Sequence, residues 1–186
     1  MIEVKEYNSS MKKLVEDFRL KTFDEGNDSI SYEKYNPEHT GKTWCVFIDN
    51  ELASISVVES SYYTGDPDIA ARVCRYHILK KFRHSNCGFR MLKLQIEWAK
   101  KQNFQILYWT HNIKNRALNA LYQHKKTMIT AKSKEFFNSD WYQQVKLDHR
   151  FLFKSAPDSK CIQYVYYINL QNNNFVWYPK KSVLWN

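Results

Sequence analysis

Residues 82–92 read Phe82-Arg83-His84-Ser85-Asn86-Cys87-Gly88-Phe89-Arg90-Met91-Leu92 and join a polar turn to the start of an apolar pattern. From Met91 to Ala99 the apolar residues recur at helical spacing. Lys93 and Glu97 fall together on the opposite side, as expected for a helix with one buried face. The pattern predicts a turn followed by an amphipathic helix.

The segments on either side of this helix are typical of strands. Arg72–Leu79 alternates and is rich in strand-forming residues, and Gln105–Thr110 is a second run of this kind. Asn112 or Asn115 can cap a further helix that extends to Tyr122. The predicted order is strand, glycine-containing turn, helix, strand, helix.

The turn before the central helix is suited to an anion. It presents backbone N–H groups at a helix N-terminus, where partial positive charge gathers, and this favours a phosphate or pyrophosphate. The turn lacks the Lys-Ser/Thr ending of a P-loop. It also lacks the spaced glycines of a dinucleotide fingerprint, because Gly88 is its one glycine. The alternative is a plain strand-to-helix turn with solvated arginines.

The N-terminal part predicts a strand, a helix and a hairpin. Ile2–Tyr7 alternates, and Ser9 or Ser10 can cap the following helix. Four apolar residues share one side of that helix: Met11, Leu14, Val15 and Phe18. Thr43–Ile48 and Leu52–Val58 predict two strands joined by a short polar turn.

The C-terminal part has a less regular pattern. Ile162–Ile168 predicts a last strand, and residues 127–137 form a weaker candidate strand that lysines interrupt. Residues 138–160 are long for a connection, so we expect them to have structure or function of their own. We expect one domain over residues 1–186, with a core over 1–170 and an aromatic and basic tail over 171–186. That tail can close the sheet, form a dimer contact or stack on single-stranded nucleic acid.

Composition limits the classes of protein and of partner. The chain has 186 residues and a formal net charge of +9, which favours anionic partners such as coenzyme A phosphates, tRNA, DNA or an acidic protein. The alternative is that excess lysine only keeps the protein in solution. No apolar run is long enough for a membrane span, and Met1–Glu6 is charged where a signal peptide is apolar. We therefore expect a cytoplasmic protein, in the host cytoplasm if the Lys- and Asn-rich chain is viral.

The cysteines do not predict a disulfide framework or a metal site. Cys74-x-x-His77 and His84-x-x-Cys87 contain zinc-ligand residue types at short spacing. However, the odd spacing of the first pair places its side chains on opposite faces of a strand. Gathering all four residues would also disrupt the predicted strand, turn and helix, so we expect no metal.

These motifs together resemble the GNAT family of acyl-CoA-dependent N-acyltransferases. Members begin their central helix with Arg or Gln, then x-x-Gly-x-Gly/Ala, and here Arg83 fits the first position and Gly88 the last. Further along, members have Asn, six residues and then Tyr preceded by Leu, which Asn115 and Tyr122 fit. The resemblance extends to most of the chain in the order of its elements.

The chain departs from the family pattern at two places. Asn86 replaces the first motif glycine, and the Gly-Phe that normally follows the tyrosine helix is missing from residues 124–127. Asn tolerates left-handed backbone angles better than most residues, so the turn can keep its shape.

The resemblance implies an α/β fold, a GNAT-like mixed twisted sheet with helices on both faces, and acetyl-CoA as the acyl donor. It implies that pantetheine bonds to the backbone near Ile78 and Lys80, and that pyrophosphate lies on the N–H groups of residues 85–90. The implied cofactor-binding residues are Ile78, Lys80, Arg83, Ser85, Asn86, Cys87, Gly88, Phe89, Arg90 and Asn115.

The implied chemistry is transfer of an acetyl group to a primary amine. Tyr122 matches the family tyrosine that protonates the leaving thiolate, although its spacing also suits a buried core residue. Residues 70–82 contain no carboxylate, so the candidate general bases are His77, Glu59 or an ordered water. The alternative for His77 is a structural role, and Asn115 can cap its helix as well as bind the cofactor.

Two other functions fit the same residues. A GNAT-like protein could acylate a nucleobase amine or an aminoacyl-tRNA, which the positive charge favours. A non-catalytic module that binds coenzyme A or nucleic acid is favoured by the two departures from the motif. The acceptor amine, the acyl chain and the oligomeric state are not identified by the sequence.

Overall fold

A computed structural model of the protein describes residues 1–24, 41–60, 68–83, 85, 87–112, 147–154 and 162–171. Their helices and strands, in chain order, are β1 (Ile2–Glu6), η1 (Ser9–Met11), α1 (Lys12–Asp24), β2 (Gly41–Ile48), β3 (Glu51–Ser60), β4 (Ala70–Ile78), η3 (Lys80–Phe82), α2 (Cys87–Lys101), β5 (Ile106–Asn112), β6 (Leu147–Lys154) and β7 (Ile162–Asn169), where η marks a 3-10 helix.

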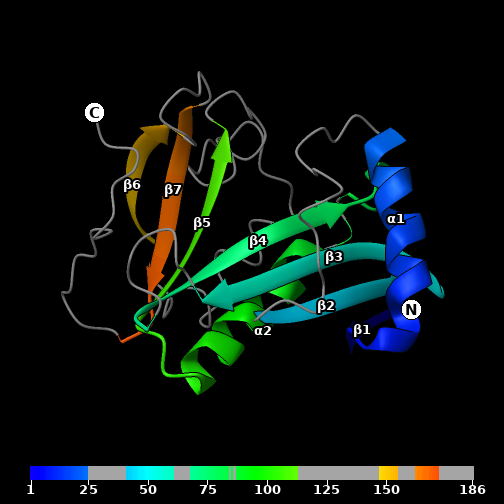
Figure 1. The fold of residues 1–186 in the computed structure, drawn as a ribbon, viewed down its shortest axis with the longest axis horizontal. Coiled ribbons are helices and arrows are strands. Elements are labelled where there is room, and N and C mark those ends of the chain that lie inside the picture. Colours follow the sequence, from blue (N-terminus) through cyan, green and yellow to red (C-terminus); the bar gives the residue numbers. More distant parts are fainter. Residues whose placement is uncertain are drawn as a thin grey trace. The chain divides into compact units, whose positions relative to one another are not determined.

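The strands within these ranges form one seven-stranded mixed sheet, in the order β1-β2-β3-β4-β5-β7-β6 (Figure 1). The chain divides into two compact units, of which unit 1 comprises Met1–Glu59 and Val73–Gln95. Unit 2 comprises Ser60–Arg72 and Ile96–Asn186, so β4 and α2 contribute residues to both units. The α/β class and the mixed sheet are confirmed. Within the described ranges, no helix is long and apolar enough to cross a membrane.

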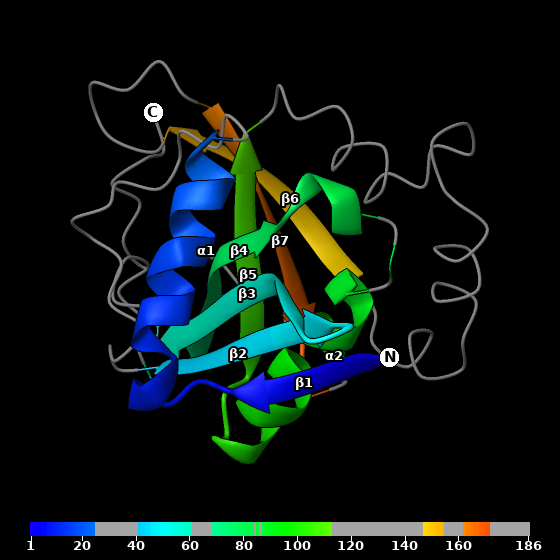
Figure 2. The same cartoon turned by 90° about the vertical axis from the view of Figure 1, so that its right-hand side faces the viewer.

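The apolar side of α1 covers one face of the strands in unit 1 (Figure 2). Val15 and Phe18 of α1 pack with Ile55 and Val57 of β3 in one buried cluster. The spacing of these residues explains the packing, because 15 and 18 share a side of a helix while 55 and 57 share a face of a strand. Leu14, which the sequence also placed on the buried side, is 40% exposed.

The other face of β3 meets α2 within unit 1. Gln95 of α2 donates from Nε2 to the hydroxyl of Ser56, and both side chains are buried. Because Ser56 points to the opposite face from Ile55, the strands of unit 1 have a helix on each face. The helices on both faces that the resemblance implied are therefore confirmed here.

The β2–β3 hairpin is confirmed, with a turn one residue shorter than predicted. Ile48 pairs with Glu51, which leaves Asp49 and Asn50 as the two turn residues. Their φ angles are 48° and 66°, respectively. Two consecutive positive φ values match the twist of the flanking strands, and Asn and Asp adopt them more readily than most residues.

Unit 2 holds the strands after the central helix. The start of β4 pairs in parallel with β5, from Ala70↔Ile106 to Arg72↔Tyr108. β5 pairs antiparallel with β7 from Ile106↔Asn169 onward, and β7 pairs antiparallel with β6. β7 confirms the predicted last strand. β6 lies inside the stretch for which only undefined structure was expected, and the candidate strand at 127–137 lies outside the described residues.

The end of α2, in unit 2, is set by a C-cap motif centred on Asn103. Asn103 has a φ of 62°, and its N–H donates to Lys100 O at 3.0 Å. The Phe104 N–H donates to Ala99 O at 3.0 Å. The Phe104 ring also packs against Trp98, with 5.6 Å between ring centroids. This pair of bonds with its apolar contact is the Schellman arrangement, and it ends the helix before β5.

Candidate functional site

The connection from β4 to α2, which lies in unit 1, folds on itself before the helix begins. The Phe82 N–H donates to Leu79 O at 2.9 Å, and the Arg83 N–H donates to Lys80 O at 3.2 Å. Ser85 donates to Phe82 O twice, from its N–H at 3.2 Å and from its hydroxyl at 2.6 Å. The short helix η3 was not predicted, and its bonds give the turn a defined path.

These bonds reduce the set of N–H groups that could form the predicted anion seat. The sequence placed it on the N–H groups of residues 85–90, but the Ser85 N–H donates to the turn. α2 begins at Cys87, and the N–H groups in the first turn of an α-helix have no intrahelical acceptor. Of the predicted donors, the N–H groups from Cys87 to Arg90 therefore lie in the first helical turn, and an anion seat there stays a prediction.

Three positively charged residues lie near this helical turn in the sequence. Lys80, Arg83 and Arg90 are exposed. Cys87 is only 1% exposed, and its Sγ lies 2.9 Å from the Ser85 hydroxyl. Cys87 therefore supports the turn from inside, whereas the three cations are accessible to an anionic ligand.

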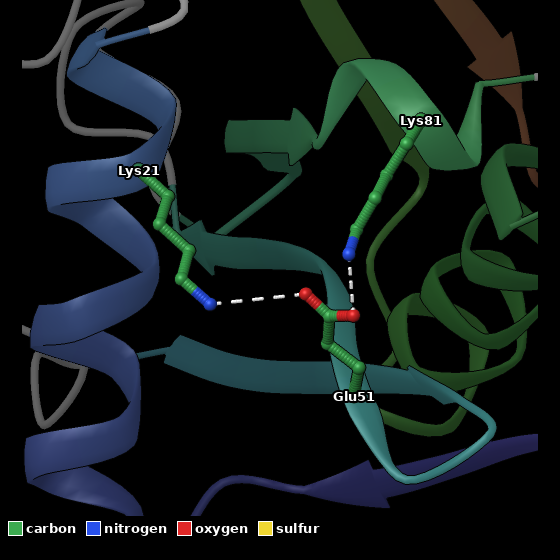
Figure 3. A network of polar contacts seen from close by, with 3 residues as sticks. All are labelled: Lys21, Glu51 and Lys81. Carbon is green, nitrogen blue, oxygen red and sulfur yellow. Dashed lines mark hydrogen bonds and ion pairs between the residues drawn. The ribbon is translucent and has the colours of Figure 1, made fainter.

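Lys81 is held by Glu51 (Figure 3). Its Nζ lies 2.5 Å from Glu51 Oε2, and Lys21 of α1 lies 3.7 Å from Oε1 of the same carboxylate. The hydrogen bond from Lys81, helped by the charges of both lysines, lowers the pKa of Glu51. Phe82 also packs against the core of unit 1, so η3 is attached through two adjacent residues.

A Glu51→Gln variant is expected to lose a small, pH-dependent part of its stability. Because the folded state lowers the pKa of Glu51, the carboxylate stabilises the fold above its unfolded pKa and ceases to do so as pH falls through the folded pKa. We expect the melting temperature to drop by about 1–3 °C near pH 7, since exposed ion pairs contribute little. Thermal melts should show this gap closing below about pH 4. A gap that is constant with pH would contradict the assignment.

The backbone at the end of β4 faces in two directions. The His77 carbonyl accepts from the Ser54 hydroxyl at 2.8 Å, and the Leu79 N–H donates to Ala53 O at 3.1 Å. Residues 77 and 79 thus bond toward β3. Since successive residues of a strand direct their backbone groups to opposite edges, Ile78 directs its N–H and C=O away from β3. Ile78 is therefore well oriented to bond an extended ligand.

The two candidate bases in the described ranges lie at different places. His77 is half-buried near the end of β4, beside Ser54. Glu59 is half-buried and pairs with Gly41. Five residues separate Ser54 from Glu59 along β3, which corresponds to about 16 Å. The fold does not bring His77 and Glu59 together.

The predicted site residues divide into two groups. The β4–α2 connection brings together Ile78, Lys80, Arg83, Ser85, Cys87, Gly88, Phe89 and Arg90. Asn86, Asn115 and Tyr122 lie outside the described residues. Sequence reasoning missed two residues of β3, Ser54, which bonds to the end of β4, and Glu51, which bonds to Lys81 of η3. Both contacts join residues that are distant in the sequence.

The sequence pattern described as Acetyltransferase (GNAT) family matches residues 9–125 of this chain. No curated protein matches the sequence. Among solved structures, a GNAT-family acetyltransferase from Staphylococcus aureus Mu50 is similar, with a TM-score of 0.59, 18% identity and coverage of 92% of this chain and 100% of that chain.

Two further solved structures share the fold. The ribosomal-protein-S18-alanine N-acetyltransferase from Escherichia coli has a TM-score of 0.58 at 9% identity, with coverage of 96% of this chain and 100% of that chain. A protein assigned as a streptothricin acetyltransferase from Bacillus anthracis, in complex with acetyl coenzyme A, has a TM-score of 0.50 at 15% identity. That match covers 77% of this chain and 70% of the other.

Proposed function

This chain belongs to the GNAT acetyltransferase family, and we propose that it transfers an acetyl group from acetyl-CoA to a primary amine. The observation that carries the proposal is the β4–α2 connection. It joins the outward-facing backbone of Ile78 to a helix N-terminus flanked by exposed Arg83 and Arg90. Acetyl-CoA, the donor that the family uses, has an extended amide-containing arm that ends in a pyrophosphate. The Ile78 backbone suits the amide-containing arm, and the helix N-terminus suits the pyrophosphate.

The proposed binding uses contacts of two physical kinds. The pyrophosphate would accept hydrogen bonds from the first-turn N–H groups of α2, where the helix dipole also favours negative charge. Arg83 and Arg90 would add charge-assisted hydrogen bonds. The pantetheine amides would pair with Ile78 in the manner of an added strand. Binding of this kind places the thioester beside the end of β4, where proximity to the amine lowers the barrier.

The proposed reaction is a direct attack. The nitrogen lone pair of the neutral amine forms a bond to the thioester carbonyl carbon, and the carbon–sulfur bond breaks with its electron pair on sulfur. Tyr122 gives its phenolic proton to that sulfur. The proton lost by the attacking nitrogen passes to His77, Glu59 or a water, and His77 is the candidate that adjoins Ile78 in the chain.

The positive charge supports nucleic acid as a source of the amine. Residues 80–101 carry exposed Lys80, Arg83 and Arg90 close to the proposed donor site. Such a surface attracts a polyanion. An aminoacyl-tRNA or a nucleobase amine therefore belongs among the acceptors to be tested, together with polyamines and lysine-containing peptides.

A thiol-release assay tests the proposed function. Purified protein is mixed with acetyl-CoA and each acceptor class, and free coenzyme A is followed with a thiol reagent. We expect one class to raise the rate at least about tenfold over the acceptor-free hydrolysis, since proximity effects in such sites are large. Mass spectrometry should show an acetyl adduct on that acceptor. Binding of acetyl-CoA without release for any class would favour the non-catalytic module.

A further inference from the structure

Positive charge is concentrated in one segment of the chain, from Lys80 to Lys101. This segment contains seven lysines and arginines and one acidic residue, Glu97, which gives it a net charge of +6 out of the +9 of the whole chain. In contrast, α1 carries four cations and three acids over Lys12–Asp24 and is nearly balanced. Most of the excess charge in the sequence therefore lies on η3, the following turn and α2.

The charged residues of α2 lie on one side of this continuous helix. Five exposed residues share that side, and we call them the basic stripe: Arg90, Lys93, Glu97, Lys100 and Lys101. At 3.6 residues per turn they fall within about 100° of the circumference and extend over about 16 Å of the helix. The opposite side is buried, with four residues at most 1% exposed: Met91, Gln95, Ile96 and Ala99. The stripe is thus the solvent side of a helix whose other side belongs to the core.

The basic stripe suits the phosphate backbone of a nucleic acid. Lysine side chains are flexible point charges that bind phosphates without reading the sequence, and each neutralised phosphate releases counterions. The stripe begins at Arg90, in the first turn of α2, where the pyrophosphate of acetyl-CoA is proposed to bind. A polyanion that follows the stripe would therefore have one part beside the donor.

The proposed reaction favours an acceptor amine with a low pKa. Residues 70–82 contain no carboxylate that could remove a proton from the amine. A lysine side chain has a pKa of about 10.4 and is almost entirely protonated at neutral pH, whereas an α-amino group has a pKa of about 7.7–8.0 and is partly neutral without a strong base. The amine of a nucleobase in a duplex is paired and stacked, so it must first be flipped out. An α-amino group attached to the end of an RNA avoids both costs.

We propose that the basic stripe docks an aminoacyl-tRNA, whose α-amine is the acceptor. The docking stands on the charge distribution alone, whereas the identity of the amine rests on the proposed function. In the reaction the α-amine nitrogen bonds to the acetyl carbon and the carbon–sulfur bond breaks. One proton leaves the nitrogen and the sulfur gains one, so the products are N-acetyl-aminoacyl-tRNA and free coenzyme A.

Binding of deacylated tRNA to the full chain tests the docking without any chemistry. Lys100→Gln with Lys101→Gln removes two charges of the basic stripe. Fluorescence anisotropy between about 50 and 200 mM salt should show the slope of log Kd against log salt reduced by about two, one for each lost phosphate contact. At about 100 mM salt the Kd for tRNA should rise about tenfold.

Lys12→Gln with Lys13→Gln is the matched control. These two lysines are also adjacent and exposed, but they lie on α1. The control removes the same charge from the protein and should change the Kd for tRNA by less than about threefold, because charges away from the stripe are screened. Both double variants should keep the melting temperature within about 3 °C of the wild type, since all four lysines are exposed.

Acetyl transfer to two substrates tests the acceptor. An aminoacyl-tRNA and the methyl ester of the same amino acid share the amine and differ in the phosphates. We expect the stripe variant to raise the KM for the aminoacyl-tRNA about tenfold while kcat stays within about twofold, because the lost contacts are uniform binding. The kcat/KM for the methyl ester, which has no phosphate to contact, should stay within about twofold.

The outcomes separate the two proposals. Binding of tRNA that the stripe variant leaves unchanged, or that both variants weaken equally, would refute the docking. A duplex DNA with the same number of phosphates that binds at least as tightly through the same lysines would refute tRNA as the occupant. Acetylation of another amine but not of the aminoacyl-tRNA would refute the acceptor alone. No transfer to any amine would refute the proposed function, and stripe-dependent binding of tRNA would still support the docking.

Discussion

A Tyr122→Phe variant is expected to transfer acetyl groups with a kcat about 100-fold below that of the wild type. The phenol is proposed to protonate the thiolate as the carbon–sulfur bond breaks, and phenylalanine keeps the ring but removes that proton. The KM for acetyl-CoA should stay within about twofold, because the phenol acts in the transition state and does not carry ground-state binding. Steady-state kinetics with the best acceptor from the thiol-release assay provide the measurement.

Tyr167→Phe is the control for this change. It makes the same chemical substitution at a tyrosine that is buried in the core cluster of unit 2. We expect it to lower the melting temperature while keeping kcat within about threefold. A Tyr122→Phe enzyme with full kcat would refute the proposed role of Tyr122 as proton donor. The fold and the proposed donor-binding site would not be affected by that result.

An Arg83→Glu variant is expected to bind acetyl-CoA about 30- to 100-fold more weakly than the wild type. The substitution removes a charge-assisted hydrogen bond and places a carboxylate near the pyrophosphate, so loss of attraction and new repulsion act together. Because Arg83 is exposed, we expect the variant to keep the melting temperature of the wild type, so that the weaker binding reports on the site. The Kd is measured by calorimetry at fixed salt, beside a thermal melt of each protein.

Lys100→Glu is the matched control for Arg83→Glu. Lys100 is exposed in the last turn of α2, and its reversal lowers the formal charge of +9 by the same two charges. Because exposed charges more than about 10 Å apart are screened at moderate salt, this control should change the Kd by less than about threefold. Equal weakening by both variants would mean that acetyl-CoA senses only the overall charge.

Regular elements were predictable because their signals are local. The polar turn between two alternating runs predicted the β2–β3 hairpin, and Asp49 and Asn50 accept the positive φ angles that it requires. The apolar periodicity from Met91 to Ala99 predicted α2. The anion seat that the polar turn before that helix indicates stays a prediction.

Irregular features escaped prediction because they break the periodicity on which prediction depends. The additional residue Ala53 allows Leu52 and Ile55 to share the same buried cluster, although strict alternation would place them on opposite faces. β6 has a similar shift between Asp148 and Arg150, which disrupts its alternation and hides the strand.

Contacts between distant segments were the second limit. Ser54 and Glu51 support the β4–α2 connection from β3, and nothing in the residues around them indicates a partner more than twenty positions away. Such pairings can be predicted only when the sheet register is known. The roles of Asn115 and Tyr122 stay predictions from the family pattern, because both lie outside the described residues.

Calorimetric titration of the wild-type chain with acetyl-CoA tests the central claim most directly. Free coenzyme A and its desulfo analogue serve as controls for the parts of the ligand that matter. A helix N-terminus, two arginines and the outward-facing backbone of Ile78 predict a Kd in the micromolar range, equivalent to about −8 kcal/mol. The desulfo analogue should bind comparably, since it keeps the pyrophosphate and the amide arm. Absence of binding at millimolar acetyl-CoA would contradict the account.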